Sequence, residues 1–103
     1  WLSPTTPGVS EPWGRYSLSR PDVDFDSIGE SIFAPVTQYT VAHNLMGTPA
    51  ISLPLAVHST GLPIGVQIAG RPAEDHVVLQ LARVLEQEMP WAGRTPPLHV
   101  SRV

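Results

Sequence analysis

Cysteine and lysine are both absent from this chain of 103 residues. Without cysteine there are no disulfides and no thiolate chemistry, and such a composition fits a reducing compartment, so we expect a cytoplasmic location. Without lysine, all six basic side chains are arginines, and they are scattered along a chain with a net charge of −3. We therefore expect no basic patch and no nucleic-acid partner.

Long apolar runs are missing as well. No stretch approaches the ~20 apolar residues that cross a membrane, so no membrane association is expected. No charged leader precedes an apolar segment, so no secretory signal is visible. The chain begins at Trp1 rather than at methionine, as is typical of a processed or truncated product.

The patterns that bind metals and phosphates are incomplete. Asp22, Asp24 and Asp26 alternate like the first ligands of an EF-hand loop. However, Ser27 stands where that loop needs glycine, and Phe33 stands where it needs a bidentate glutamate. The four histidines lack metal-ligand spacing, and no glycine-rich loop leads into a helix. We expect no metal ion and no cofactor.

A self-contained hydrolytic site is not visible either. No serine lies in a Gly-x-Ser-x-Gly elbow. His58 and Ser59 are adjacent in the sequence, but the side chains of neighbouring residues point apart, so adjacency does not make them a catalytic pair. We therefore assign no catalytic residue.

Two apolar stretches with period-2 alternation occupy the middle of the chain, and this period predicts strands. Gly61 and Pro63 in their connection predict an antiparallel hairpin over residues 50–70, and Pro54 predicts a bulge. One face of the hairpin carries large residues: Ile51, Leu53, Leu55, Val57, Ile64, Val66 and Ile68. The other face is small and uncharged. We expect another part of the protein chain, or a second copy of this chain, to cover that face.

Helices are predicted on both sides of the hairpin. Apolar residues recur at helical spacing from about residue 33 to Met46, and Gly47 is suited to end that helix. His43 lies on its apolar stripe, and we interpret it as a packed, hydrogen-bonded imidazole. After Pro72, a second helix is predicted to bury one stripe and to stop at Pro90. The members of that stripe are Val77, Val78, Leu81, Val84, Leu85 and Met89.

The expected organisation has two parts. Residues 1–30 form a proline-rich irregular arm packed on the core, because prolines, serines and glycines dominate but anchoring aromatics are present. Residues 31–103 form a helix–hairpin–helix unit. The fold class predicted is α/β.

Motifs along nearly the whole chain resemble the C-terminal part of the amidase signature family. The residues that carry the resemblance run from Asn44-x-x-Gly47-x-Pro49-Ala50-Ile51-Ser52-x-Pro54, through Gly61-Leu62-Pro63-Ile64-Gly65-Val66-Gln67-Ile68-x-Gly70-Arg71-Pro72, to Glu74-Asp75. The resemblance implies a partial amidase-signature fold whose hairpin belongs to a larger mixed sheet. Such enzymes hydrolyse carboxamides with a Ser–cis-Ser–Lys triad. Neither the Gly/Ser-rich signature nor the lysine is present here.

The resemblance places three candidate residues near the catalytic sheet: Asn44, Gly47 and Gln67. Each is a candidate for the substrate pocket or for a structural role. The structural role of Asn44 would be to satisfy backbone groups at the helix end, and that of Gln67 would be to hold two backbone segments together as a buried amide. We favour these structural roles.

The function implied is that of a C-terminal fragment of an amidase-like hydrolase, which supplies sheet core and pocket wall but no triad. Its partner would be the remainder of the amidase chain or a second copy of this chain. A small carboxamide substrate would be a partner only in the intact enzyme. The alternative is a stand-alone non-catalytic α/β module that acts through self-association or a protein partner. An independent serine–histidine hydrolase ranks last.

Overall fold

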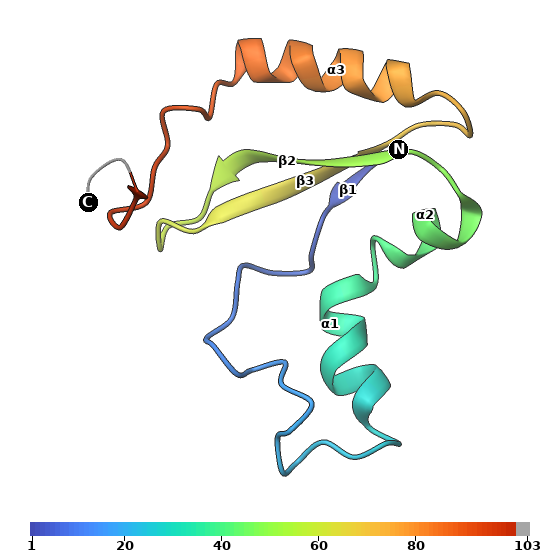
Figure 1. Cartoon of the computed structure of the whole chain (residues 1–103), viewed down its shortest axis with the longest axis vertical. Coiled ribbons are helices and arrows are strands. Elements are labelled where there is room, and N and C mark those ends of the chain that lie inside the picture. The colour runs from blue at the N-terminus through green and yellow to red at the C-terminus, as the bar shows by residue number, and fades with distance from the viewer. Residues whose placement is uncertain (101–103) are drawn as a thin grey trace.

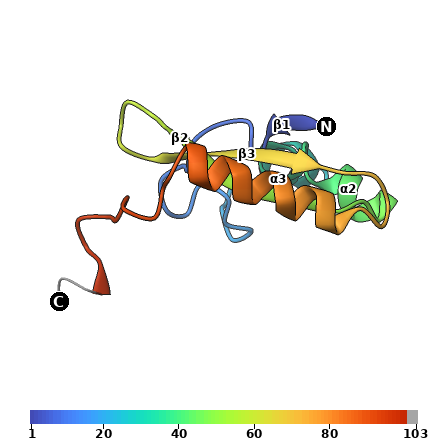
Figure 2. The ribbon, with the colours of Figure 1, turned by 90° about the horizontal axis from the view of Figure 1, so that it is seen from above.

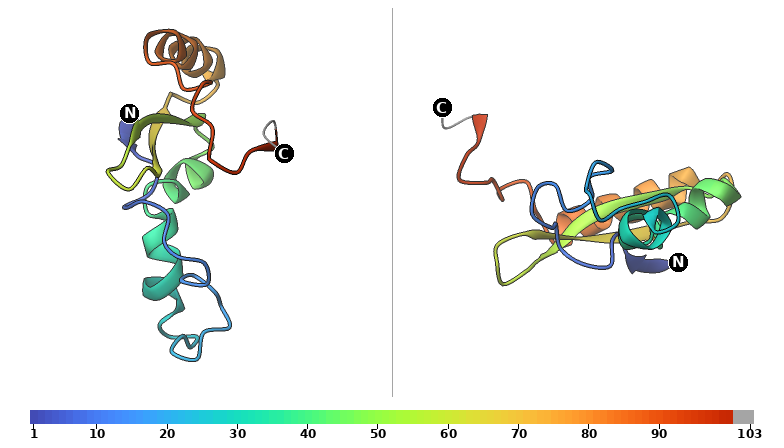
Figure 3. Two further views of the ribbon diagram at one scale, coloured as in Figure 1. Left: turned by 90° about the vertical axis from the view of Figure 1, so that its left-hand side faces the viewer. Right: turned by 90° about the horizontal axis from the view of Figure 1, so that it is seen from below.

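A three-stranded antiparallel sheet lies between helices in the computed structural model, which describes residues 1–100 (Figure 1). Its strands, in the order β1-β3-β2, are β1 (Leu2–Pro4), β3 (Pro63–Ala69) and β2 (Ala50–Val57). Helix α3 (Asp75–Glu88) lies on one side, and α1 (Ala34–Thr37) and α2 (Val41–Met46) lie on the other (Figure 3). None of the helices in residues 1–100 has the length and apolar character needed to cross a membrane.

The central hairpin is antiparallel, as predicted, and Ile51 pairs with Ile68 across it. Gly61 has a φ of +86° in the connecting loop, which a residue without a Cβ adopts at little cost. The expected bulge is present, since the register shifts between Leu53 and Ala56. The shift also corrects the predicted alternation. Val57 pairs with Pro63 beyond the bulge and leaves the face that carries Leu53.

The start of the arm is more regular than its sequence indicated. Strand β1 covers Leu2–Pro4 and pairs with β3, with Ser3 opposite Gln67. Pro4 is acceptable there because β1 is an edge strand, where a missing N–H costs no ladder bond.

The single helix predicted over residues 33–46 is wrong in detail, because the structure breaks it. A π-helical turn, Gly29–Phe33, leads into α1, and the N–H of Ala34 donates to the carbonyl of Gly29. Pro35 follows directly. A proline in a helix has no N–H and crowds the carbonyl four residues before it, which is consistent with a widened turn at this point. Residues 38–40 then form a turn before α2 begins.

Helix α3 runs lengthwise over the hairpin (Figure 2) and buries only part of the predicted stripe, because Val78 and Leu85 face the sheet and the other four members do not. Val78 and Ala82 are its buried residues. Ala82 joins Leu53 and Ile68 in the core cluster, with Leu85 and Trp91 packed against it. The remaining stripe members are substantially exposed: Val77, Leu81, Val84 and Met89.

After α3 the chain returns to the sheet. Trp91 packs against the core cluster, and Arg94 Nη1 donates to the carbonyl oxygen of Pro54 at 3.0 Å. The carbonyl at the β2 bulge is therefore satisfied by a side chain from the end of the chain.

Candidate functional site

Hydroxyl and amide side chains form a row across the sheet face that lies opposite α3. Gln67 is central in β3, only 4% exposed, and its Nε2 donates to the carbonyl oxygen of Tyr39 at 2.8 Å and to Ser3 Oγ at 3.3 Å. Further along, the Thr5 and Ser52 hydroxyls lie 2.6 Å apart. Gln67 therefore ties the turn between α1 and α2 to the sheet.

A pocket of about 320 Å³ lies between the α1–α2 segment and the end of the sheet. We call it the helix–sheet pocket, and its walls are formed by Trp1, Gln38, Tyr39, Ala42, His43, Met46, Thr48 and Gly70. Its volume falls within the range usual for small-molecule sites, and most of its lining is apolar.

One imidazole is held in a fixed place in this pocket. His43 Nδ1 lies 2.8 Å from Thr48 Oγ1, and both residues are partly buried. Gly47, with a φ of +63°, ends α2 in the left-handed conformation, and the N–H of Thr48 donates to the carbonyl oxygen of His43 at 3.1 Å. The turn at Gly47 therefore brings the Thr48 hydroxyl back to the His43 ring, with which it forms a hydrogen bond.

The three candidate residues from the sequence surround this pocket without lining it. Asn44 is exposed on α2. The carbonyl of His43 at the end of that helix is satisfied by the backbone N–H groups of Gly47 and Thr48, so the expected capping role does not belong to the Asn44 side chain. Gly47 shapes the turn. Gln67 holds the main chain of Tyr39, a wall residue, which is the buried-amide role expected for it.

Sequence reasoning missed most of the pocket lining. Trp1, Tyr39 and Met46 come from separate segments, and only the fold brings them together. His43 was interpreted as a packed, hydrogen-bonded ring, and its bond to Thr48 agrees with that interpretation. The spacing of five residues between His43 and Thr48 is the one sequence signal that could have indicated the pair, because a helix-ending glycine lies between them.

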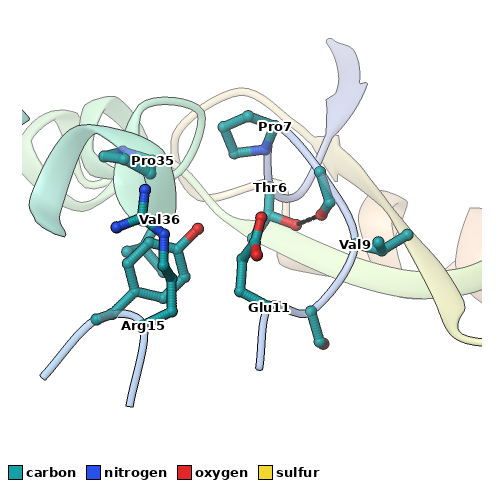
Figure 4. Close-up of a pocket in the computed structure, with 10 residues that line it drawn as sticks. Thr6, Pro7, Val9, Glu11, Arg15, Pro35 and Val36 are labelled. Atoms are coloured by element: carbon teal, nitrogen blue, oxygen red, sulfur yellow. Dashed lines mark hydrogen bonds between the residues drawn. The ribbon is translucent and has the colours of Figure 1, made fainter. Parts of the chain in front are cut away.

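A second cavity lies between the arm and α1. This arm pocket has a volume of about 540 Å³ and is lined by Thr6, Pro7, Gly8, Val9, Ser10, Glu11, Arg15, Tyr16, Pro35 and Val36. The side chains of Glu11 and Arg15 both rise from the arm into this space (Figure 4). The arm side is irregular chain, and the pocket carries groups of both charges.

Two carboxyls with perturbed acidity lie in the arm. A hydrogen bond from Arg20 lowers the pKa of Asp22, and the hydrogen bonds that Asp24 accepts from Ser27 lower the pKa of Asp24. Both carboxyls lie on exposed residues, so these contacts are surface interactions. Within residues 1–100 no cluster of three His, Cys, Asp or Glu side chains is arranged to hold a metal ion.

The arrangement offers binding groups and no assembled acyl-transfer machinery within residues 1–100. Ser52 is paired with Thr5, and His43 and His58 each bond a threonine hydroxyl. Acyl transfer would need an activated nucleophile together with its base. These side chains can instead position and hydrogen-bond a ligand.

Comparison with known proteins assigns the family. The Amidase family matches residues 4–79. A glutamyl-tRNA(Gln) amidotransferase subunit from Thermodesulfovibrio yellowstonii is 45% identical over 76 residues, which cover 69% of this chain and 16% of that protein. The 6-aminohexanoate-cyclic-dimer hydrolase of Pseudomonas sp. is 47% identical over 60 residues, which cover 58% of this chain and 12% of that protein.

A solved structure agrees with the sequence matches. The structure of 6-aminohexanoate cyclic dimer hydrolase superimposes with a TM-score of 0.82 at 32% identity, covering 93% of this chain and 20% of that one. This chain therefore spans about a fifth or less of the proteins it matches, so it corresponds to one piece of a larger enzyme fold. It belongs to the amidase family.

Proposed function

We propose that this chain is the C-terminal part of an amide hydrolase, in which it completes the sheet and forms one wall of the substrate pocket. The observation that carries the proposal is the match of 93% of the chain, at a TM-score of 0.82, to a fifth of 6-aminohexanoate cyclic dimer hydrolase. The sequence relatives are named as a hydrolase of that cyclic dimer and as an amidotransferase for glutamyl-tRNA(Gln). These names are the basis for proposing carboxamide hydrolysis.

The catalytic groups would come from chain outside these 103 residues. Amide hydrolysis needs an activated nucleophile, a proton shuttle and donors for the oxyanion. The family resemblance assigns these to a Gly/Ser-rich segment and a lysine, and this sequence contains no lysine. The partner we propose is therefore the remainder of the amidase chain, and a carboxamide is hydrolysed only in the assembled enzyme.

A chimera tests the proposal. The fifth of the 6-aminohexanoate cyclic dimer hydrolase that matches this chain is replaced by these 103 residues, and amide hydrolysis is measured alongside the 103-residue chain alone. We expect turnover by the chimera and none by the chain. A matched chimera with Leu53→Glu, which places a charge in the core cluster, should be inactive.

Two results would contradict the proposal. One is a folded chimera without activity. The other is stoichiometric labelling of one serine in the isolated chain by an acyl-transfer probe, abolished by a single His→Ala substitution, which would indicate a self-contained hydrolase.

The exposed residues of α3 favour a second candidate, a non-catalytic module that self-associates. Val77, Leu81 and Val84 recur at helical spacing and are at least 43% exposed, so they form a stripe that a partner could cover. Sedimentation of the isolated chain separates the two candidates. One defined oligomer favours the module, whereas a range of aggregates favours an enzyme part without its covering chain.

A further inference from the structure

We propose that the helix–sheet pocket binds the non-reacting part of a substrate: a neutral hydrocarbon chain or ring that carries one uncharged hydrogen-bonding group. The hydrocarbon would contact Tyr39, Met46 and Trp1, and the polar group would bond His43. The word substrate rests on the proposed function. The binding itself is a property of these residues and is tested separately.

The charge of the lining selects a neutral ligand. None of the residues that line the helix–sheet pocket is an aspartate, glutamate or arginine. A cation that left water for this pocket would find no opposite charge to compensate its lost hydration, and an anion would find only the α-ammonium of Trp1, which already donates to the carbonyl oxygen of Ala69 at 3.0 Å. The arm pocket differs in this respect, because Glu11 and Arg15 both line it. The volume of about 320 Å³ lies at the small end of the range for ligand sites, which limits the hydrocarbon to a short chain or a single ring.

The His43–Thr48 pair supplies one adaptable hydrogen-bonding position. Nδ1 of the ring is engaged by Thr48 Oγ1, so Nε2 is the nitrogen left to meet a ligand. A threonine hydroxyl can donate or accept, and the neutral imidazole then presents the opposite capacity at Nε2. The pair can therefore donate to a carbonyl oxygen or accept from an N–H without becoming charged.

The Tyr39 and His43–Thr48 walls are held in place before any ligand arrives. Gln67, buried in the sheet, fixes the main chain of Tyr39 through a bond of 2.8 Å. The backbone of Thr48 is tied to that of His43 by the turn at Gly47. A pocket whose walls are already ordered loses less conformational entropy when it binds, which favours a small ligand with few contacts.

The test uses three probes of equal length on the 103-residue chain: hexanamide, hexanoate and hexylammonium. Binding is followed by NMR shifts of the backbone amides of Tyr39, His43, Thr48 and Gly70. We expect saturable shifts with hexanamide and at least about ten-fold weaker binding of both charged probes. Equal binding of the three probes, or no saturable shift with hexanamide, would overturn the proposal.

Matched variants identify the hydrogen-bonding group. His43→Leu and Thr48→Val should each weaken hexanamide binding by about five-fold, as expected for one lost hydrogen bond. The control is His58→Leu, because His58 Nδ1 bonds Thr60 Oγ1 at 2.9 Å in the exposed hairpin loop and His58 does not line the pocket. That variant should bind hexanamide normally. A His43→Leu variant with unchanged affinity would contradict the assignment.

The same substitutions in the chimera keep the two proposals apart. There His43→Leu should raise KM for a neutral amide and leave kcat nearly unchanged, because it removes binding that is equal in ground and transition states. If the chimera is active and His43→Leu leaves its KM unchanged, this inference is wrong and the proposed function stands. If the chimera is inactive but the 103-residue chain binds hexanamide, the proposed function is wrong and this inference stands.

Discussion

The two faces of the sheet use the same three strands but are completed in different ways. On one face, Leu53 and Ile68 are covered by α3 from within the chain, and both are nearly inaccessible. On the other face, Gln67 is buried beneath the α1–α2 turn, whereas Ala50 and Ser52, on the neighbouring strand, remain exposed. This chain alone covers the apolar face of the sheet, but it covers the polar face only in part.

Under the proposed function, the polar face is where the rest of an amidase chain would pack. The sequence predicts that the small, uncharged face is covered only with help from other chain. Ala50 and Ser52 are exposed, in agreement with that prediction, whereas Ala69 on the same face is buried by this chain alone. Apolar burial gains free energy wherever it occurs, so α3 can pack without a partner. The polar face needs hydrogen-bonding partners at defined positions, and this chain supplies them for Gln67 and for Ser52, which is paired with Thr5.

The largest effect should come from the apolar face. Leu53→Ala removes a side chain that is 5% exposed at the centre of the core cluster, and we expect a loss of about 2–4 kcal/mol in the free energy of unfolding. Leu81→Ala, at 43% exposed, should cost less than about 1 kcal/mol, although its place on the predicted stripe suggested otherwise. Urea melts measure both, and equal losses would mean that α3 is rotated from the position described.

Adding a methyl group on either face should lower stability by less than Leu53→Ala does, and by similar amounts on the two faces. A Cβ at Gly70 would lie 2.8 Å from Val78 Cγ2 beneath α3, and one at Gly65 would lie 2.8 Å from Thr5 Oγ1 on the polar face. We expect Gly70→Ala and Gly65→Ala each to lower stability by about 1–2 kcal/mol.

Gly93→Ala is the control for these overpacking variants, because nothing lies within 4 Å of the added carbon. It should leave the melting temperature within about 2 °C of the parent chain. If Gly65→Ala melts like the control while Gly70→Ala does not, the polar face is looser than the structure shows.

The polar face itself is tested by Gln67→Leu. This change keeps the volume but removes the donor to the carbonyl of Tyr39, so we expect a loss of about 1–2 kcal/mol and faster hydrogen exchange in α2. Ser3→Ala removes only the longer contact, at 3.3 Å, and should cost less. Exchange rates in α2 that match the parent chain would show that Gln67 does not hold the helical segment.

The hairpin was predictable because its signals are local. Pro54 and Gly61 mark a bulge and a turn by their own backbone limits, and both features are confirmed. The buried side of α3 was predictable only in part, because its apolar arc is wider than one stripe: Val78 and Leu85 were on the predicted stripe and Ala82 was not. The small side chain of Ala82 packs with Leu53 and Ile68 in the core cluster.

The pocket was less accessible to sequence reasoning than the fold. Tyr39 and Thr48 flank a helix, whereas Gly70 follows a strand, and no periodicity connects them. A turn at residues 38–40 interrupts the helix that the apolar spacing predicted, so that α2 begins only at Val41. Gln67 could be placed in the sheet by its alternation, but its partner at Tyr39 follows only from the tertiary arrangement.

The smallest effect is expected away from both faces, in the acidic arm. Hydrogen bonds from Arg20 and Ser27 lower the pKa values of Asp22 and Asp24 from their ordinary value of 3.8. A carboxyl with a lowered folded-state pKa contributes stability that is present above the unfolded pKa and is lost as pH falls through the folded pKa. Carboxyl chemical shifts followed from about pH 6 to about pH 2 should therefore give midpoints below 3.8 for both groups.

Salt should separate the two carboxyls. Asp22 contacts a charged guanidinium, whereas Asp24 contacts only neutral donors. About 1 M salt should therefore move the midpoint of Asp22 back toward its ordinary value more than that of Asp24. Equal movement of the two midpoints would show that the general field of the arm, rather than the bond to Arg20, sets the pKa of Asp22.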